Sequence, residues 1–168
     1  MLATYEEDSL GDRWCRGEVG FPEVAARVAA RCGIAVGAAR AAMEHDWRHL
    51  RPNAEILAFA RELGRAGRAA VVTVNPDAFS DLIVPHYGLD RDFGVIVASW
   101  QERTLDKVGL CDIALERFAA PAKRESTLLV DNRPDNVEAF RAAGGQAYFF
   151  TDDPRFVVDV PAIRGRLE

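Results

Sequence analysis

Apolar residues along the chain follow two different spacings, one in its first third and another in the remainder. Over the segment Glu6–Leu50 they recur at helical intervals, and no strand-like apolar run interrupts them. Pro22 suits the first turn of one helix, Gly33 marks the end of that helix, and Val36–Trp47 predicts a second helix. This first region is therefore expected to be helical throughout.

In the remainder of the chain, short apolar and β-branched runs alternate with helical patterns. Asn53 is placed to cap a helix that ends at Gly64–Gly67, and the later helices are expected at Asn75–Val84, Lys107–Phe118 and Pro134–Ala143. The strands expected between them are Ala69–Val74, Gly94–Ala98, Thr127–Val130 and Gln146–Phe150. Buried strands that alternate with helices predict an α/β fold with a parallel sheet covered by helices on both faces.

Composition and charge exclude several function classes. Of the 168 residues, 49% are hydrophobic, which is enough to form a core. The chain has 21 basic and 26 acidic residues and no basic run, so nucleic acid is not an expected partner. Its apolar runs are too short to cross a bilayer, and the first residues lack the pattern of a signal peptide. A cytoplasmic protein that does not enter membranes is therefore expected. The three cysteines show no spacing typical of a disulfide framework or a zinc site.

Polar residues gather where the predicted strands end, and in open α/β sheets ligands bind beyond the carboxyl ends of the strands. Thr73 and Asn75 follow the first strand, at a helix N-terminus suited to an anion. Lys107 begins the helix after the second strand, and Asp131 and Asn132 follow the third. A hydroxyl, a lysine and an acidic loop on successive strand ends suit a phosphate group and a divalent metal.

This set of residues, in this order, resembles the haloacid dehalogenase-like hydrolase superfamily, especially its phosphatase branch with a helical cap. Thr73 stands at the second motif, whose hydroxyl holds the transferring phosphoryl group, and Lys107 at the third, whose lysine neutralises negative charge. The segment Leu129–Gly144 resembles the fourth motif, and residues 1–50 and 51–168 then match a helical cap and an α/β core. The resemblance implies a Rossmannoid sheet, a small phosphorylated metabolite as the substrate, Thr73 and Lys107 as catalytic residues, and Mg²⁺ as the cofactor.

Two departures from the family pattern affect the expected activity. The family's Asp-x-Asp motif, whose first aspartate attacks phosphorus, has no counterpart, because Asp8 and Asp12 follow no apolar strand and have the wrong spacing. Asn132 replaces a metal-binding aspartate, and an amide brings no negative charge to a dication that prefers carboxylates. Asp131 and Asn132 are therefore expected to hold Mg²⁺ weakly or not at all, and the chain as given is expected not to hydrolyse phosphate monoesters.

Two interpretations of the function stay open. One is a hydrolase whose given sequence is incomplete at its start, and the other is a non-catalytic binding or regulatory protein. The segment from Asp131 to Asn136 is also typical of a turn that caps the following helix, and a turn of this kind is compatible with the family motif.

The strand that carries the missing motif lies, in the resembled fold, between Ala69–Val74 and Thr127–Val130. Without it, these two strands are expected either to pair directly or to leave edges that recruit a second copy of the chain. A strand at Met1–Tyr5 that filled the gap would contradict this interpretation of the N-terminus.

His45 and His49 lie four residues apart on one helical face, a spacing that can bind zinc. The sequence offers no identifiable third ligand, so a solvated pair or a pair at the cap interface is the favoured interpretation. Trp14, Trp47 and Trp100 are interpreted as packing residues rather than as the lining of a substrate pocket.

Overall fold

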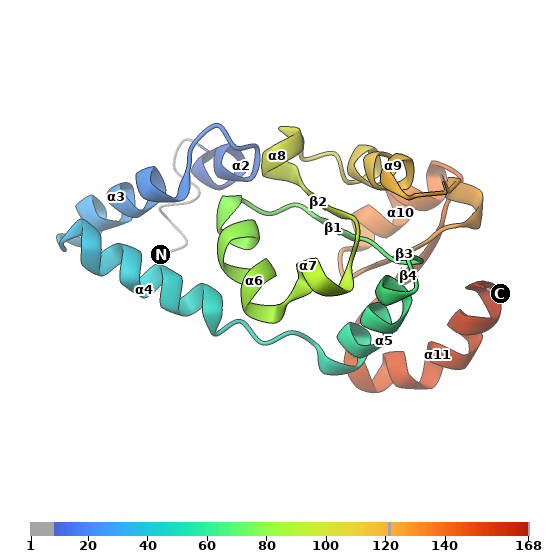
Figure 1. Ribbon diagram of the computed structural model, residues 1–168. Coiled ribbons are helices and arrows are strands. Elements are labelled where there is room, and N and C mark those ends of the chain that lie inside the picture. Colours follow the sequence, from blue (N-terminus) through green and yellow to red (C-terminus); the bar gives the residue numbers. More distant parts are fainter. Residues whose placement is uncertain (1–8, 121, 168) are drawn as a thin grey trace. The chain divides into compact units, whose positions relative to one another are not determined.

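The computed structural model describes residues 9–120 and 122–167, and Figure 1 labels their helices and strands. The segment Met1–Tyr5 and the acidic residue Asp8 lie outside the described residues. The chain divides into two compact units, and each is described by itself. The first unit contains the chain up to Arg51 together with Val72–Arg91 and Val97–Asp106, and the second contains Pro52–Val71, Asp92–Ile96 and the chain from Lys107 onward.

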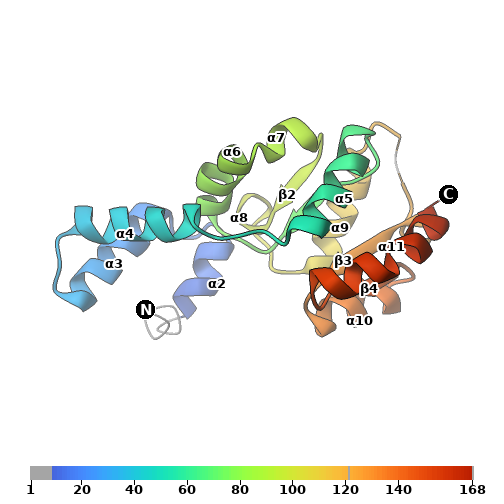
Figure 2. The ribbon, with the colours of Figure 1, turned by 90° about the horizontal axis from the view of Figure 1, so that it is seen from below.

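The first unit begins with helices α2 (Leu10–Cys15), α3 (Phe21–Cys32) and α4 (Val36–Arg48). Pro22 lies in the first turn of α3, and Gly33 ends this helix with φ of 66°, a left-handed conformation that glycine adopts without steric cost. Helices α3 and α4 lie side by side as a hairpin (Figure 2). The predicted helical character of this region is confirmed for the described residues.

Aromatic and small residues form the core of the first unit. Trp14 stacks on Phe21 with ring centroids 5.9 Å apart and meets Trp47 edge-on at 6.2 Å. Val24 is fully buried in the same cluster, which also includes Ala78 from the segment after the first strand. Trp14 and Trp47 are therefore packing residues, as their size suggested.

Asp77 joins the N-terminal helices to that later segment. Its carboxylate accepts hydrogen bonds from Trp14 Nε1 at 2.6 Å, from the Phe21 N–H at 2.9 Å and from the Ala78 N–H at 2.9 Å. The buried hydroxyl of Ser99 donates to the carbonyl oxygen of Cys15 at 2.7 Å. These long-range bonds explain why 72–91 and 97–106 group with the first 51 residues, which the spacing of apolar residues did not predict.

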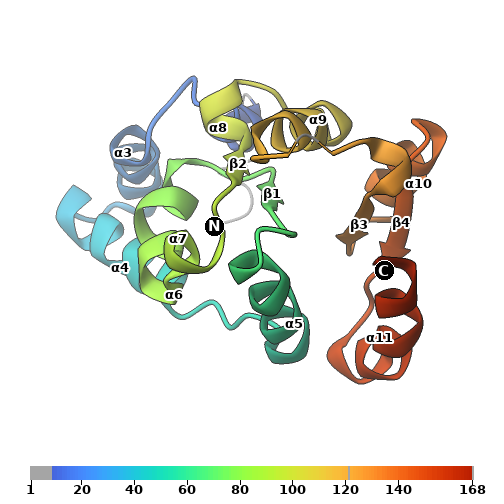
Figure 3. The ribbon, with the colours of Figure 1, turned by 45° about the vertical axis from the view of Figure 1, so that its right-hand side comes forward.

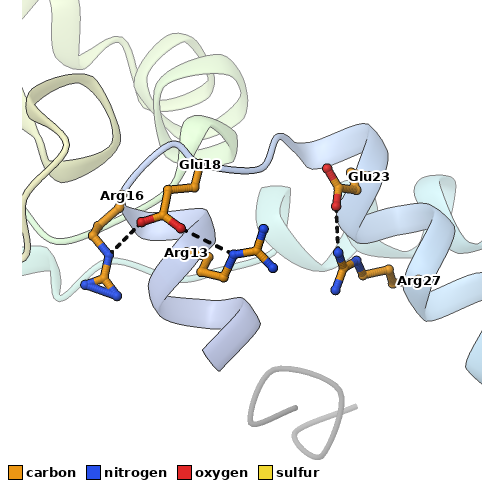
Figure 4. A network of polar contacts seen from close by, with 5 residues as sticks. All are labelled: Arg13, Arg16, Glu18, Glu23 and Arg27. Atoms are coloured by element: carbon orange, nitrogen blue, oxygen red, sulfur yellow. Dashed lines mark hydrogen bonds and ion pairs between the residues drawn. The ribbon is translucent and has the colours of Figure 1, made fainter. Parts of the chain in front are cut away.

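The charged surface of α2 and α3 carries short ion pairs (Figure 4). Glu18 accepts from Arg13 Nε at 3.3 Å and from Arg16 Nε at 3.1 Å, and Glu23 accepts from Arg27 at 2.8 Å. These side chains are largely solvated, so the pairs contribute little to stability.

The strands are short and form two small parallel sheets. Strand β1 (Val71–Thr73) pairs with β2 (Ile96–Ala98), and β3 (Leu128–Asp131) pairs with β4 (Gln146–Phe149) (Figure 3). In the second sheet Leu128 lies opposite Gln146 and Asp131 opposite Phe149. The α/β class is confirmed, and each strand lies at its predicted place along the chain to within two residues at either end.

The structure corrects the expectations about the strands. Instead of the single parallel sheet expected, the described residues form two sheets, β1 with β2 and β3 with β4. Of the two alternatives for the gap, direct pairing of β1 with β3 therefore does not occur. The side chains of β1, and those of Leu128, Leu129 and Val130 in β3, are half-buried rather than covered on both faces. An apolar run reports a tendency to be buried, whereas actual burial depends on what packs against the strand.

Self-association through the unpaired strand edges remains a prediction, and light scattering would test it.

Of the remaining helices, one precedes β1 and the others lie between or after the strands. They are α5 (Ala54–Arg65), the π-helical turn η2 (Phe79–Ile83), α6 (Val84–Tyr87), α7 (Leu89–Asp92), α8 (Ser99–Glu102), α9 (Lys107–Arg117), the 3₁₀ turn η3 (Arg124–Ser126), α10 (Pro134–Ala142) and α11 (Asp153–Leu167). Asn53 occupies the cap position of α5, but its side chain makes no capping bond. Asp153 Oδ1 instead accepts from the Ile56 N–H at 3.3 Å. Asn53 is therefore the N-cap residue, as predicted, but the side chain that accepts a hydrogen bond from the first turn of α5 is that of Asp153.

Helix α11 contributes to the core of the second unit. Phe156 on α11 is fully buried, with its ring edge-on to Phe59 at 5.5 Å and to Phe150 at 5.8 Å. The half-buried Leu128 and Val130 of β3 pack against this cluster. The sequence analysis did not predict this helix, which contains Pro161, and proline ordinarily argues against a helix interior.

Candidate functional site

A buried ion pair lies at the carboxyl end of β3 in the second unit. Asp131 is the last residue of β3, and Lys107 is the first residue of α9. Lys107 Nζ lies 3.1 Å from Asp131 Oδ2, and the two side chains are only 11% and 8% exposed. The structure therefore brings together two of the residues that the sequence analysis selected.

Two further donors hold the Asp131 carboxylate. The backbone N–H of Arg133 donates to Oδ1 at 2.8 Å, and Asn136 Nδ2 lies 3.2 Å from both carboxylate oxygens. Both donors belong to the turn that starts α10, whose N-terminus favours a negative charge. The sequence placed Asn136 in this turn and in the segment that resembles the fourth motif, and the structure adds its contact with Asp131.

A second, separate pair lies in the first unit. Asn75 Nδ2 donates to Thr73 Oγ1 at 2.5 Å, where β1 ends. The backbone carbonyl of Asn75 accepts from the Ser99 hydroxyl at 3.1 Å, which fixes the chain at this point. Thr73 and Asn75 are thus neighbours, as expected, but they belong to a different unit from Lys107 and Asp131.

The loop between β3 and α10 also carries an exposed ion pair. Arg133 donates to Asp135 Oδ2 at 2.6 Å, and this hydrogen bond holds the pKa of Asp135 below its usual value. Asn132 lies between these residues and Asp131, and it is exposed. The loop therefore presents one carboxylate that is already paired and one neutral amide to solvent.

This donor set does not fit a magnesium ion. A carboxylate accepts about four hydrogen bonds, and the contacts from Lys107, Asn136 and the Arg133 N–H occupy those of Asp131. A dication at Asp131 would have to displace the Lys107 ammonium, and Asn132 supplies no compensating charge. Within the described ranges, no group of three or more His, Cys, Asp or Glu residues is placed to hold a metal ion.

Of the two acidic residues Asp8 and Asp12, Asp12 is among the residues that the structure describes, and it lies within α2. A residue inside a helix does not occupy the place of a nucleophile at a strand end.

No protein-family model matches this chain, and no curated protein sequence matches it either. The resemblance to haloacid dehalogenase-like hydrolases therefore rests on the motif residues alone. In the part of the chain that the structure describes, no helix is both long enough and apolar enough to cross a membrane.

Proposed function

We propose that this chain is a haloacid dehalogenase-like α/β scaffold with a helical cap, and that it binds the phosphate group of a small metabolite without hydrolysing it. The observation that carries the proposal is the contact between Lys107 and Asp131. The family motifs predict that a lysine at a helix start and an aspartate at a strand end belong to one site. Their placement within 3.1 Å of each other supports that assignment.

Lys107 supplies the positive charge for such a phosphate. Its ammonium has three donors, so it can contact Asp131 and a phosphate oxygen at once. Asp131 acts as a positioning residue, because it holds the ammonium in place and is itself held by Asn136 and the Arg133 N–H. The pair remains neutral overall without a metal ion.

Thr73 and Asn75 belong to the first unit, and we propose for them, separately, the uncharged phosphate-binding role that the family resemblance gives them. The Asn75 amide carries two N–H groups, and the bond to Thr73 uses one of them. A hydroxyl and an amide next to the helical segment after Pro76 are suited to phosphate oxygens. None of these groups forms an aspartyl-phosphate, so the proposal contains no covalent step.

The second candidate function is phosphate ester hydrolysis with a nucleophile from outside these 168 residues. The two-stranded sheets favour it, because among the described residues β1 and β3 each keep one edge at which a further strand could pair. The closed Lys107–Asp131 pair favours the binding function, because the carboxylate is already neutralised and its hydrogen bonds are complete.

Calorimetry with inorganic phosphate and a turnover assay with p-nitrophenyl phosphate and MgCl₂ test the proposal together. We expect phosphate binding that Lys107→Gln weakens at least roughly tenfold, as the loss of a charged hydrogen bond implies. Lys123→Gln, at the exposed second lysine, is the matched control and should leave binding unchanged. Magnesium-dependent turnover that Lys107→Gln abolishes would show that the chain is a hydrolase, and phosphate binding insensitive to Lys107→Gln would refute the site.

A further inference from the structure

His45 and His49 lie at the C-terminal end of α4 and take no part in the proposed phosphate site. Both residues are exposed, so a ligand reaches them without opening the core. Their rings face each other with centroids 3.8 Å apart and planes inclined by 27°. The four-residue spacing seen in the sequence thus becomes a direct contact between two imidazoles.

The four-residue spacing, rather than the present stacking, suits shared coordination of one metal ion. Imidazole nitrogen binds Zn²⁺, Ni²⁺ and Cu²⁺ well, at metal–nitrogen distances of about 2.0–2.1 Å for zinc. Two nitrogens bound to adjacent positions of such an ion lie roughly 3 Å apart. In stacked rings the nitrogen lone pairs run side by side, so binding one ion requires these exposed side chains to change their χ angles until both lone pairs point at it.

Nδ1 of His49 contacts a backbone carbonyl, as the non-ligating ring nitrogen does in many metal sites. His49 Nδ1 lies 2.7 Å from the carbonyl oxygen of His45. A carbonyl oxygen only accepts, so this contact fits the neutral tautomer that has its proton on Nδ1, and in that tautomer Nε2 carries the lone pair that binds a metal. Ligating histidines commonly donate their second ring nitrogen to a backbone carbonyl.

The surrounding charges also favour a cation. His49 is the C-cap residue of α4, where the last carbonyl groups give the helix end a partial negative charge. Glu44, on the same helix, is paired with Arg40 at 2.8 Å and with Arg48 at 3.5 Å. Both guanidinium groups are therefore engaged with a carboxylate, which offsets their repulsion of a metal ion.

We propose that His45 and His49 form a two-histidine site for one borderline transition-metal ion, such as Zn²⁺, Ni²⁺ or Cu²⁺. The two imidazoles supply the protein ligands, and solvent completes the coordination. The bound ion links the last turn of α4 to its C-cap residue and so stabilises this end of the helix. The site lies within the first unit and is independent of the proposed phosphate function.

Calorimetric titration of the tag-free chain with NiCl₂, in a buffer that does not chelate metals, tests the proposal. We expect one Ni²⁺ per chain. His45→Asn and His49→Asn should each weaken binding at least roughly tenfold, because each removes the advantage of a second ligand on the same helix. His86→Asn is the matched control, since it removes the chain's third histidine, and it should leave the affinity unchanged.

A double variant separates the geometry from the number of histidines. Asp46→His combined with His49→Asn keeps three histidines but places two of them at adjacent positions, which point to different sides of the helix. This variant should bind Ni²⁺ as weakly as His49→Asn alone. Circular dichroism checks that each variant keeps its helix content. The absence of Ni²⁺ binding to the unmodified chain, or wild-type affinity in either single variant or in the double variant, would overturn the proposal.

Discussion

Lys107 Nζ lies 3.1 Å from Asp131 Oδ2, with both side chains almost fully removed from solvent. Burying two charges costs desolvation free energy, which is offset only where opposite charges meet in good geometry. The backbone N–H of Arg133 and the Asn136 amide complete the carboxylate's hydrogen bonds. Removing one member of this pair should therefore cost more stability than removing both.

Lys107→Ala should lower the free energy of unfolding by about 3 kcal/mol, because it leaves the Asp131 carboxylate buried without its counter-charge. The double variant Lys107→Met with Asp131→Asn should recover much of that loss. Urea denaturation measures both values. Asp135→Ala, which breaks the exposed pair with Arg133, is the control and should leave the midpoint unchanged. Equal losses for Lys107→Ala and the double variant would contradict this account of the pair.

Asn132→Asp should tighten Mg²⁺ binding without producing phosphatase activity. The change adds a carboxylate beside Asp131, and carboxylates are the ligands that hard dications prefer. Calorimetry with MgCl₂ measures the effect. Gln146→Glu adds the same charge at the opposite end of the β3–β4 sheet and should not change the affinity. Tight Mg²⁺ binding by the unmodified chain would show that Asp131 is more accessible to a metal than its contacts indicate.

Asp77→Ala should destabilise the first unit by roughly 1–3 kcal/mol, because the Trp14 and Phe21 donors lose their acceptor. Trp14→Phe removes one of these bonds and keeps an aromatic ring, so its effect should be smaller. Denaturation followed by circular dichroism compares the two variants. An unchanged midpoint for Asp77→Ala would mean that water replaces this acceptor at no cost.

Gly64→Ala should be destabilising although alanine favours helices. A Cβ atom at Gly64 would lie 2.5 Å from the carbonyl oxygen of Asp92 and 2.7 Å from the Phe93 ring. Gly37 is the matched control, because it also lies in a helix but a Cβ there meets nothing within 4 Å. Gly37→Ala should stabilise the chain by up to about 1 kcal/mol. Thermal unfolding of both variants gives the comparison. Stabilisation by Gly64→Ala would show that the Asp92 carbonyl and the Phe93 ring leave room for a Cβ atom.

Cys15 should react with iodoacetamide more slowly than the exposed Cys32 at pH 8. Burial, followed by the nearby Asp12 charge, raises the pKa of the Cys15 thiol from 9.0 to about 11. The folded state therefore favours the neutral thiol, and this contribution to stability is complete below pH 9 and is lost as the pH rises toward 11. Peptide mass spectrometry after timed labelling measures the two rates. Equal labelling rates for Cys15 and Cys32 in the folded protein would contradict the raised pKa of Cys15.

Local patterns in the sequence were enough to place the four strands that the structure describes and most of the longer helices. Pro22 and Gly33 bound α3 because proline fits a helix start and glycine adopts the left-handed conformation that ends one. The same patterns put Lys107 at a helix start and Asp131 at a strand end, where ligands bind in α/β folds. These features depend on a few neighbouring residues, so they can be recognised without knowing the rest of the chain.

Only the tertiary structure decided which segments meet. Asp77 binds Trp14 and the Phe21 backbone across more than fifty positions, and Asp153 accepts from the first turn of α5 although it lies near the far end of the chain. The strands pair as β1 with β2 and β3 with β4, a choice that apolar runs of similar composition do not encode. Such contacts depend on the packing of distant side chains, whereas the spacing of apolar residues reports only the face that each segment buries.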